Sequence, residues 1–181
     1  SSNYEGQIDE IRIWNKARSS KEINSTMNAI LDGSEENLAA YWQFDEPSGE
    51  RLLDSSNNDN TAILSDATRI QPVTPAFGSL TFERDDYVEI TEDSFSIHNL
   101  DISESVTMEA WVYFDPSDTT EQDILTKGEN YSLSAQFDFE GKIRIMTASG
   151  TDSTTSTYDL EAERWYHIAS VINSENGSHT L

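Results

Sequence analysis

The stretch Leu38-Ala-Ala-Tyr-Trp-Gln-Phe-Asp-Glu-Pro-Ser-Gly49 decides how the rest of the chain is interpreted. Its bulky side chains alternate as far as Phe44, a pattern typical of a half-buried β-strand. The residues from Pro47 to Gly49 then favour a turn. A run crowded with side-chain oxygens follows, Leu53-Asp-Ser-Ser-Asn-Asn-Asp-Asn60. We therefore predict a strand over 39–45 and a polar turn after it.

A second, related stretch lies close to the start, Gly6-Gln-Ile-Asp-Glu-Ile-Arg-Ile-Trp-Asn15. The spacing of its isoleucines predicts a short strand over 7–14. The sequence Ser19-Ser-Lys-Glu22 is a capping-box pattern, which marks the start of a helix. Apolar residues follow at helical spacing until Gly33 supplies a stop. We predict one short amphipathic helix, over 20–31.

Short strand patterns separated by turn residues recur through the rest of the chain. In the segment 105–114, Val106, Met108, Ala110 and Val112 alternate with other side chains, as in a half-buried strand. Many short strands at such spacing favour an antiparallel β-sandwich over a parallel α/β fold. We expect an all-β fold with one short helix near the N-terminus. The predicted strands beyond residue 45 are 61–65, 79–83, 86–91, 105–114, 122–126, 130–138, 141–148, 155–160 and 164–173.

The composition excludes several classes of function. The chain has 181 residues, with 11 basic against 34 acidic ones and a formal net charge of -23. Such a surface repels phosphate backbones, so nucleic-acid binding is not expected, whereas divalent cations are favoured. Cysteine is absent, which excludes a disulfide scaffold, thiol catalysis and cysteine-ligated zinc. No apolar run approaches the ~20 residues that a membrane-spanning helix needs, so no membrane span is expected.

The order of several phrases resembles the laminin G-like, concanavalin A-type jelly-roll domains. Each phrase alone is a weak signal, but together they extend over nearly the whole chain in a specific order. The resemblance implies a jelly-roll β-sandwich. The phrases are the two stretches quoted above, Leu80-Thr-Phe-Glu-Arg-Asp-Asp-Tyr-Val-Glu-Ile90, Val106-Thr-Met-Glu-Ala-Trp-Val-Tyr-Phe114 and Arg164-Trp-Tyr-His-Ile-Ala-Ser-Val171.

The strand at 7–14 resembles the last strand of such a domain, although here it comes first. This order suggests a tandem array in a longer protein. Residues 1–33 are then the closing strand and C-terminal helix of a preceding jelly-roll repeat. Residues 38–181 are a laminin G-like domain truncated at its C-terminal end. Because the connector is short, we hypothesise that the first strand occupies the closing position beside 39–45.

A calcium site is the sharpest local candidate. Hard cations take six to eight oxygen ligands, and the polar turn supplies many side-chain oxygens, though not at EF-hand spacing. The alternative is that Asn and Asp serve only as turn residues. The resemblance implies a structural calcium ion between the first and last strands, to which Asp9 or Glu10 contributes. The candidate ligands in the strand and turn are Asp45, Glu46, Asp54, Asn57, Asn58 and Asp59.

Aromatic residues are the candidates for sugar binding, because sugars stack on exposed aromatic faces. The four tryptophans all lie inside strand patterns, so we expect them in the core. Tyrosines near loops are better candidates for a ligand site. The residues predicted to contact a ligand are Tyr113, Tyr131 and Tyr158, with Phe114 as a further option.

No catalytic residue is predicted. Glucanases of this fold place two carboxylates at alternating positions of one strand, and no such alternation is present. Asp86 and Glu89 come nearest, and we expect them to face solvent. The histidines make no metal-binding spacing, and His167 is expected to pack or to form a hydrogen bond.

From the resemblance we expect a non-catalytic carbohydrate-binding or adhesion module of a larger secreted or cell-surface protein. Its partners would be a glycan or an extracellular protein ligand, and neighbouring repeats in the same chain. Two alternatives stay open. The repeat is a structural spacer without a ligand of its own, or it is an accessory domain of a glycoside hydrolase or sialidase.

Overall fold

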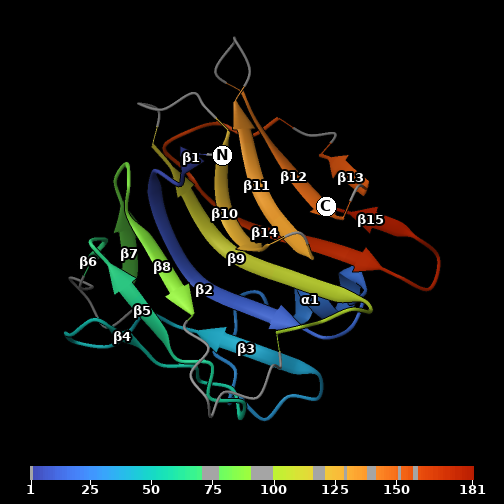
Figure 1. Cartoon of the computed structure of the whole chain (residues 1–181), viewed down its shortest axis with the longest axis horizontal. Coiled ribbons are helices and arrows are strands. Elements are labelled where there is room, and N and C mark those ends of the chain that lie inside the picture. Colours follow the sequence, from blue (N-terminus) through green and yellow to red (C-terminus); the bar gives the residue numbers. More distant parts are fainter. Residues whose placement is uncertain are drawn as a thin grey trace.

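The computed structural model describes residues 2–70, 78–90, 100–115, 121–128, 130–137, 142–150, 152–156 and 159–181. These residues form one helix, three sheets and the loops between them (Figure 1). The elements are β1 (Ser2–Asn3), β2 (Gly6–Trp14), α1 (Ser20–Thr26), β3 (Leu38–Trp42), β4 (Arg51–Leu52), β5 (Ala62–Ser65), β6 (Thr68–Ile70), β7 (Ser79–Phe82), β8 (Tyr87–Ile90), β9 (Val106–Phe114), β10 (Gln122–Lys127), β11 (Tyr131–Phe137), β12 (Ile143–Ser149), β13 (Asp152–Thr155), β14 (Trp165–Asn173) and β15 (Ser178–Thr180).

Two sheets pack face to face and enclose the main core. The seven-stranded sheet runs β15-β14-β9-β2-β7-β6, with β3 also paired to β2. The five-stranded sheet runs β1-β10-β11-β12-β13 and lies over one face of it (Figure 1). A three-stranded sheet, β4-β5-β8, adds Val88 and Ile90 to the edge of the same core. The predicted antiparallel β-sandwich is confirmed, with β1–β10 as a parallel pair.

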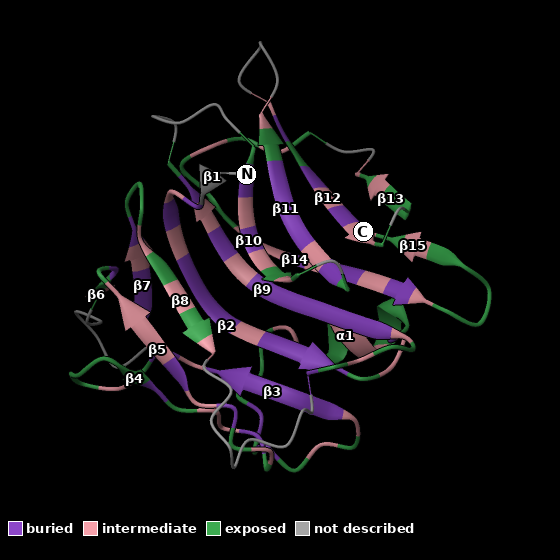
Figure 2. Ribbon diagram, in the orientation of Figure 1, coloured by how far each residue is buried: buried purple, intermediate pink, exposed green. Residues whose placement is uncertain are grey.

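The alternation of β9 separates the two faces of the seven-stranded sheet. Met108, Ala110 and Val112 point into the core and are at most 2% exposed. Thr107 and Glu109 are equally buried but contact the region of α1 on the opposite face. We call this opposite face the outer face. Figure 2 shows that β9 and β2 are buried along most of their length, because both of their faces are covered.

The strand β2 lies inside the seven-stranded sheet and joins segments that are distant in sequence (Figure 1). It pairs antiparallel with β9 along most of its length. It also pairs with β3, with Ile11 opposite Trp42 and Ile13 opposite Ala40. The predicted pairing of the first strand with the strand that begins near residue 38 is therefore confirmed. The division into a preceding repeat and a following domain stays a prediction.

The helix α1 begins as predicted but ends five residues early. The capping box at its start is present, since Glu22 and Ser19 exchange hydrogen bonds. The helix stops at Thr26 because side chains from the sheet take the carbonyls that would continue it. Arg12 donates to the carbonyls of Thr26 and Ala29, at 2.8 and 2.7 Å. Hydrogen bonds from Arg12 and Trp111 therefore tie the residues after the helix to the outer face.

Other strand boundaries differ from the prediction for local reasons. The strand predicted over 39–45 ends at Trp42, since Phe44 adopts a left-handed backbone conformation with φ 55°. Of the strand predicted over 155–160, residues 157–158 lie outside the described residues; β13 ends at Thr155, and Leu160 makes an isolated bridge to Ile143. The short strands β1, β4, β6 and β15 were not predicted. Two or three residues are too few to show an alternation.

No helix in the described part of the chain is long and apolar enough to cross a membrane.

Candidate functional site at a fork in the sheet

Along one of its edges, β2 changes its partner strand at Asp9 and Glu10. We call this point the fork. Before it, residues 6–8 pair with β7; after it, residues 11–14 pair with β3. The register against β9 also shifts here, and Glu10 has φ 54°. This β-bulge places two consecutive carboxylates on the outer face. Both line a pocket there, whereas Ile11 turns toward the interior.

The Glu10 carboxylate is buried at the fork and 6% exposed. Its Oε2 accepts hydrogen bonds from the Arg12 guanidinium and from the Tyr41 hydroxyl, the latter at 2.6 Å. Burial, followed by the contact with Glu10, raises the pKa of Tyr41 to about 12. Among the described residues, Oε1 of Glu10 has no hydrogen-bond partner. A buried carboxylate oxygen without a partner is costly, and a cation or a polar ligand would relieve that cost.

The Asp9 carboxyl lies beside the Glu10 carboxylate and is 8% exposed. Its Oδ1 accepts a hydrogen bond from the backbone N–H of Glu10 at 2.8 Å. Burial raises the pKa of Asp9 to about 8, and the negative charges of Glu10 and Asp45 add to this shift. Asp45 itself accepts the backbone N–H of Gly78 at 2.5 Å. The fork is thus a place where negative charge is concentrated and poorly solvated.

A cation would fit this charge, but not through side chains alone. In the parts of the chain that the structure describes, no cluster of three or more His, Cys, Asp or Glu side chains is placed to hold a metal ion. A calcium ion at Asp9 would need backbone oxygens and water to complete its six to eight ligands. The unpartnered oxygen of Glu10 and the raised pKa of Asp9 are the observations that fit such an ion.

The other predicted calcium ligands have structural tasks. Both oxygens of Asp54 accept hydrogen bonds, from the backbone N–H groups of Tyr41, Ser56 and Asn60 and from two side chains. Asn58 and Asn60 donate side-chain N–H groups to the carbonyls of β3. The loop 54–60 therefore protects the outer edge of β3, as unpaired sheet edges require. These residues therefore act as turn residues, which is the alternative to calcium binding that the sequence left open.

The remaining candidates lie at the surface or pair elsewhere. Glu46 accepts the backbone N–H of Leu53 and forms a salt bridge with Arg69 at 2.7 Å. Asn57 and Asp59 are exposed in the loop. Of the predicted set, the structure brings together only Asp9, Glu10 and Asp45.

A pocket of about 370 Å³ opens on the outer face next to the fork, and we call it the outer-face pocket. Asp9 and Glu10 line it, together with the chain after α1 and the rings of Trp111 and Trp165. Trp165 is 41% exposed. Trp111 is half-buried and fixed by its indole N–H, which donates to the carbonyl of Met27 at 3.0 Å. The pocket thus combines one exposed and one anchored aromatic ring with two carboxyl groups. The lining residues are Asp9, Glu10, Met27, Asn28, Ala29, Gly78, Ser79, Trp111 and Trp165.

The exposed position of Trp165 corrects the expectation that all tryptophans lie in the core. Trp14 and Trp42 are buried as expected, each 3% exposed. A period of two along β14 would have revealed the difference. Ile168 and Ile172 point inward, so Trp165 has the opposite parity and faces outward.

The three predicted ligand tyrosines have different positions. Tyr113 is half-buried, and its ring lies 5.8 Å from that of Trp165, beside the outer-face pocket. Tyr131 is 2% exposed, and its hydroxyl donates to the carbonyl of Leu100 at 2.9 Å, so it offers no face for stacking. Burial raises the pKa of Tyr131 above its usual range. Tyr158 lies outside the described residues.

A buried polar network fixes the outer face below α1. Glu109 pairs with the Arg18 guanidinium and lies 3.4 Å from Nε2 of His167. The His167 ring packs edge-on against Trp111, with ring centroids 5.4 Å apart. The predicted packing role of His167 is consistent with this contact. The network thereby holds Trp111 at the pocket wall.

The antiparallel sandwich is consistent with a concanavalin A-like domain, a class with lectins and glucanases among its members. A laminin G family model, described as the concanavalin A-like lectin/glucanases superfamily, matches residues 82–181. That is more than half of the chain, which therefore belongs to this superfamily. Searches of curated proteins and of solved structures gave no match. The membership confirms the resemblance seen in the sequence and leaves catalysis undecided, because the superfamily includes both kinds of protein.

Proposed function

We propose that the domain is a non-catalytic carbohydrate-binding or adhesion module, with the outer-face pocket as its binding site. The observation that carries this proposal is the pairing of the exposed Trp165 with the carboxyl groups of Asp9 and Glu10 in one pocket. Aromatic rings stack against the C–H faces of sugars, while a few polar groups bind the hydroxyls. The partner would be a glycan or an extracellular protein that carries one, and the setting a secreted or cell-surface protein.

The contacts of the two carboxyl groups at the fork fit a non-catalytic role better than they fit glycoside hydrolysis. Glycoside hydrolysis needs one carboxyl to protonate the leaving group and a second to act as nucleophile or base. Asp9 has a pKa suited to an acid, near 8. Its neighbour Glu10 is held by Arg12 and Tyr41, so it is placed for structure rather than for attack. Release of reducing ends from a bound glycan would contradict the non-catalytic role.

The first prediction concerns Trp165. After a glycan array has identified a ligand, Trp165→Ala should weaken binding on the order of tenfold or more in isothermal titration calorimetry, because a central stacking residue dominates such sites. Tyr87→Ala is the matched control, since Tyr87 is 49% exposed and does not line the outer-face pocket. Equal binding by Trp165→Ala would remove the pocket as the site. Absence of any glycan binding by the wild-type chain would favour the spacer alternative.

The second prediction concerns calcium, which we propose as a structural ion at the fork. Asp9 would be its principal side-chain ligand, with oxygens of Glu10 and Asp45 nearby. Calcium that binds only the folded chain stabilises it and so raises the melting temperature. At a calcium concentration of 100 times the Kd, the stabilisation is about 2.7 kcal/mol. Asp9→Asn should abolish the shift, whereas Asp59→Asn should retain it, since Asp59 is exposed in the loop after Asp54. No shift with millimolar calcium would rule the ion out.

The tandem arrangement is also part of the proposal. The strand β2 completes the seven-stranded sheet that the segment from residue 38 builds. In an array of repeats, the closing strand of one copy would fill this position. An accessory domain of a glycoside hydrolase or sialidase would use the same architecture, and the neighbouring domains of the parent protein distinguish the two cases.

A further inference from the structure

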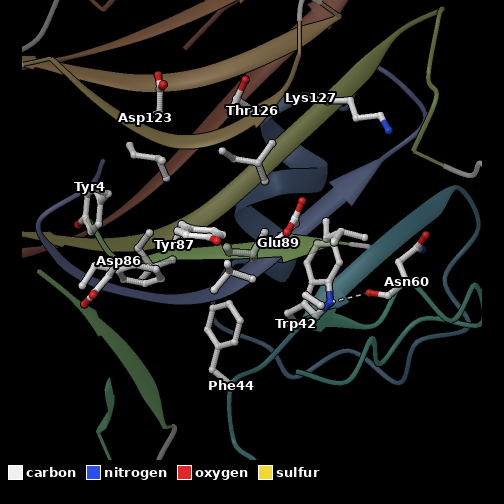
Figure 3. A pocket seen from close by; sticks show the side chains of 18 of the residues that line it. Tyr4, Trp42, Phe44, Asn60, Asp86, Tyr87, Glu89, Asp123, Thr126 and Lys127 are labelled. Carbon is white, nitrogen blue, oxygen red and sulfur yellow. Dashed lines mark hydrogen bonds between the residues drawn. The ribbon is translucent and has the colours of Figure 1, made fainter. Parts of the chain in front are cut away.

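A cavity of about 490 Å³ lies on the other face of the seven-stranded sheet, between the layers of the sandwich (Figure 3). We call it the inter-sheet cavity. Ile11 and Trp42 line it from β2 and β3. Strands β8 and β10 supply the opposite wall, and β8 lies below β10 in the view of Figure 3. It shares no lining residue with the outer-face pocket.

The cavity exists because the second layer is interrupted. Strand β8 belongs to the three-stranded sheet and β10 to the five-stranded sheet, and in the described part of the chain the two strands do not pair. Both face the same part of the seven-stranded sheet. The fork widens the space from below, since the bulge in β2 turns Ile11 toward it. A continuous sheet would have closed this gap.

The walls of the inter-sheet cavity are largely apolar. A register shift in β10 lets the consecutive residues Ile124 and Leu125 both line the cavity. Val88 and Ile90 face it from β8 and are only half-buried. Trp42 forms the floor, and its indole N–H is already bonded to the carbonyl of Asn60 at 2.9 Å (Figure 3). Exposed apolar walls around a volume of this size are typical of small-molecule sites.

The polar residues of the cavity carry mostly negative charge. Three carboxylates line it, those of Asp86, Glu89 and Asp123, together with one cation, Lys127. Lys127 forms a salt bridge with Asp101 at 3.2 Å, which offsets its charge. A ligand with a cationic end would complement this lining, whereas an anionic ligand would be repelled by it and by the net charge of -23.

We propose that the inter-sheet cavity binds a small amphiphilic amine, with a compact apolar body between β8 and β10 and a protonated amino group beside the carboxylates. The apolar body gains by leaving water. The ammonium group stays near the surface, where Glu89 is exposed. This site is separate from the proposed carbohydrate site and does not depend on it.

The test uses three probes with the same apolar body, 1-aminoadamantane, 1-adamantanol and 1-adamantanecarboxylate, in calorimetric titrations. The amine should bind about tenfold more tightly than the alcohol, and the carboxylate most weakly. Val88→Trp fills the cavity and should weaken binding of the amine about tenfold or more. Leu125→Trp is a second filling variant, at a half-buried position of the β10 wall. Ile30→Trp, at a residue that is 61% exposed and outside the cavity, should leave binding unchanged.

The charge preference has its own variant. Glu89→Gln should bring the affinity for the amine close to that for the alcohol, with the melting temperature unchanged. Failure of the wild-type chain to bind any of the probes at millimolar concentration overturns the proposal. Equal affinity for amine and alcohol overturns the assignment of a cationic ligand. Binding that both filling variants leave intact overturns the location.

Discussion

Replacing Arg12 by Met is expected to lower the free energy of unfolding by about 3–5 kcal/mol. The guanidinium is 1% exposed and donates to Glu10 and to the carbonyls of Thr26 and Ala29. It also lies over the ring of Tyr41, 5.1 Å from the ring centroid. Methionine fills much of the volume but removes the cation from a buried carboxylate and a donor from two carbonyls, although Thr26 keeps the N–H of Ala29 and Glu10 keeps the Tyr41 hydroxyl. The loss is measured by urea denaturation at 25 °C.

Lys16→Met is the matched control, because it also removes a cation from an ion pair. Lys16 pairs with Glu22 at 2.7 Å, but both side chains are more than a third exposed. Its removal should cost no more than about 1 kcal/mol. Adding Glu10→Gln to Arg12→Met should recover part of the loss, since the buried charge is then gone. A loss below about 1 kcal/mol for Arg12→Met would contradict the idea that this cation holds the fork together.

Asp9→Asn is expected to stabilise the calcium-free protein at neutral pH. The pKa of Asp9 is about 8 in the folded chain, against 3.8 for the ordinary group. Between these values the folded state keeps a proton that the unfolded state has released. The contribution of Asp9 to stability therefore falls as the pH rises, by about 1.4 kcal/mol per pH unit, and levels off above about pH 8. At pH 7 the accumulated loss is about 4 kcal/mol, which the variant avoids.

The measurement is the free energy of unfolding from pH 4 to pH 8 with a chelator present. The wild-type and Asp9→Asn curves should coincide near pH 4 and separate steadily above it. Asparagine can still accept the backbone N–H of Glu10, so the bulge should persist. Asp59→Asn should follow the wild-type curve. Parallel curves for Asp9→Asn and wild type would show that Asp9 is solvated in the folded chain.

Strand positions followed from the sequence because alternation is a local property. The strands at 106–114 and 165–173 were predicted to within one residue, and the pairing of β2 with β3 was also predicted. The fork was not, because a single alternating pattern through residues 7–14 contains no sign that the neighbouring strand changes midway. The early end of α1 was missed because it also depends on a contact between distant parts of the chain. It depends on Arg12, which approaches the helix from the sheet.

The candidate site was predicted only in part. Asp9, Glu10 and Asp45 meet at the fork, but Asp54 proved to hold a loop against β3. A carboxylate that accepts several backbone N–H groups looks identical in sequence to one that binds a cation. Trp165 could have been recognised from the parity of β14. The wall formed by Trp111 depends instead on Met27, which lies far away in the chain.

The central place of β2 has a consequence for how the chain folds. Residues 6–14 pair with residues 107–114, so β2 finds its main partner only after about a hundred intervening residues are available. Such nonlocal pairing slows folding, because loop-closure entropy is lost before the contacts form. During synthesis, β2 can pair with β3 and β7 first, but its other edge stays open until β9 emerges from the ribosome. The hairpin of β11 and β12 has no such delay, and we expect it to form before the seven-stranded sheet is complete.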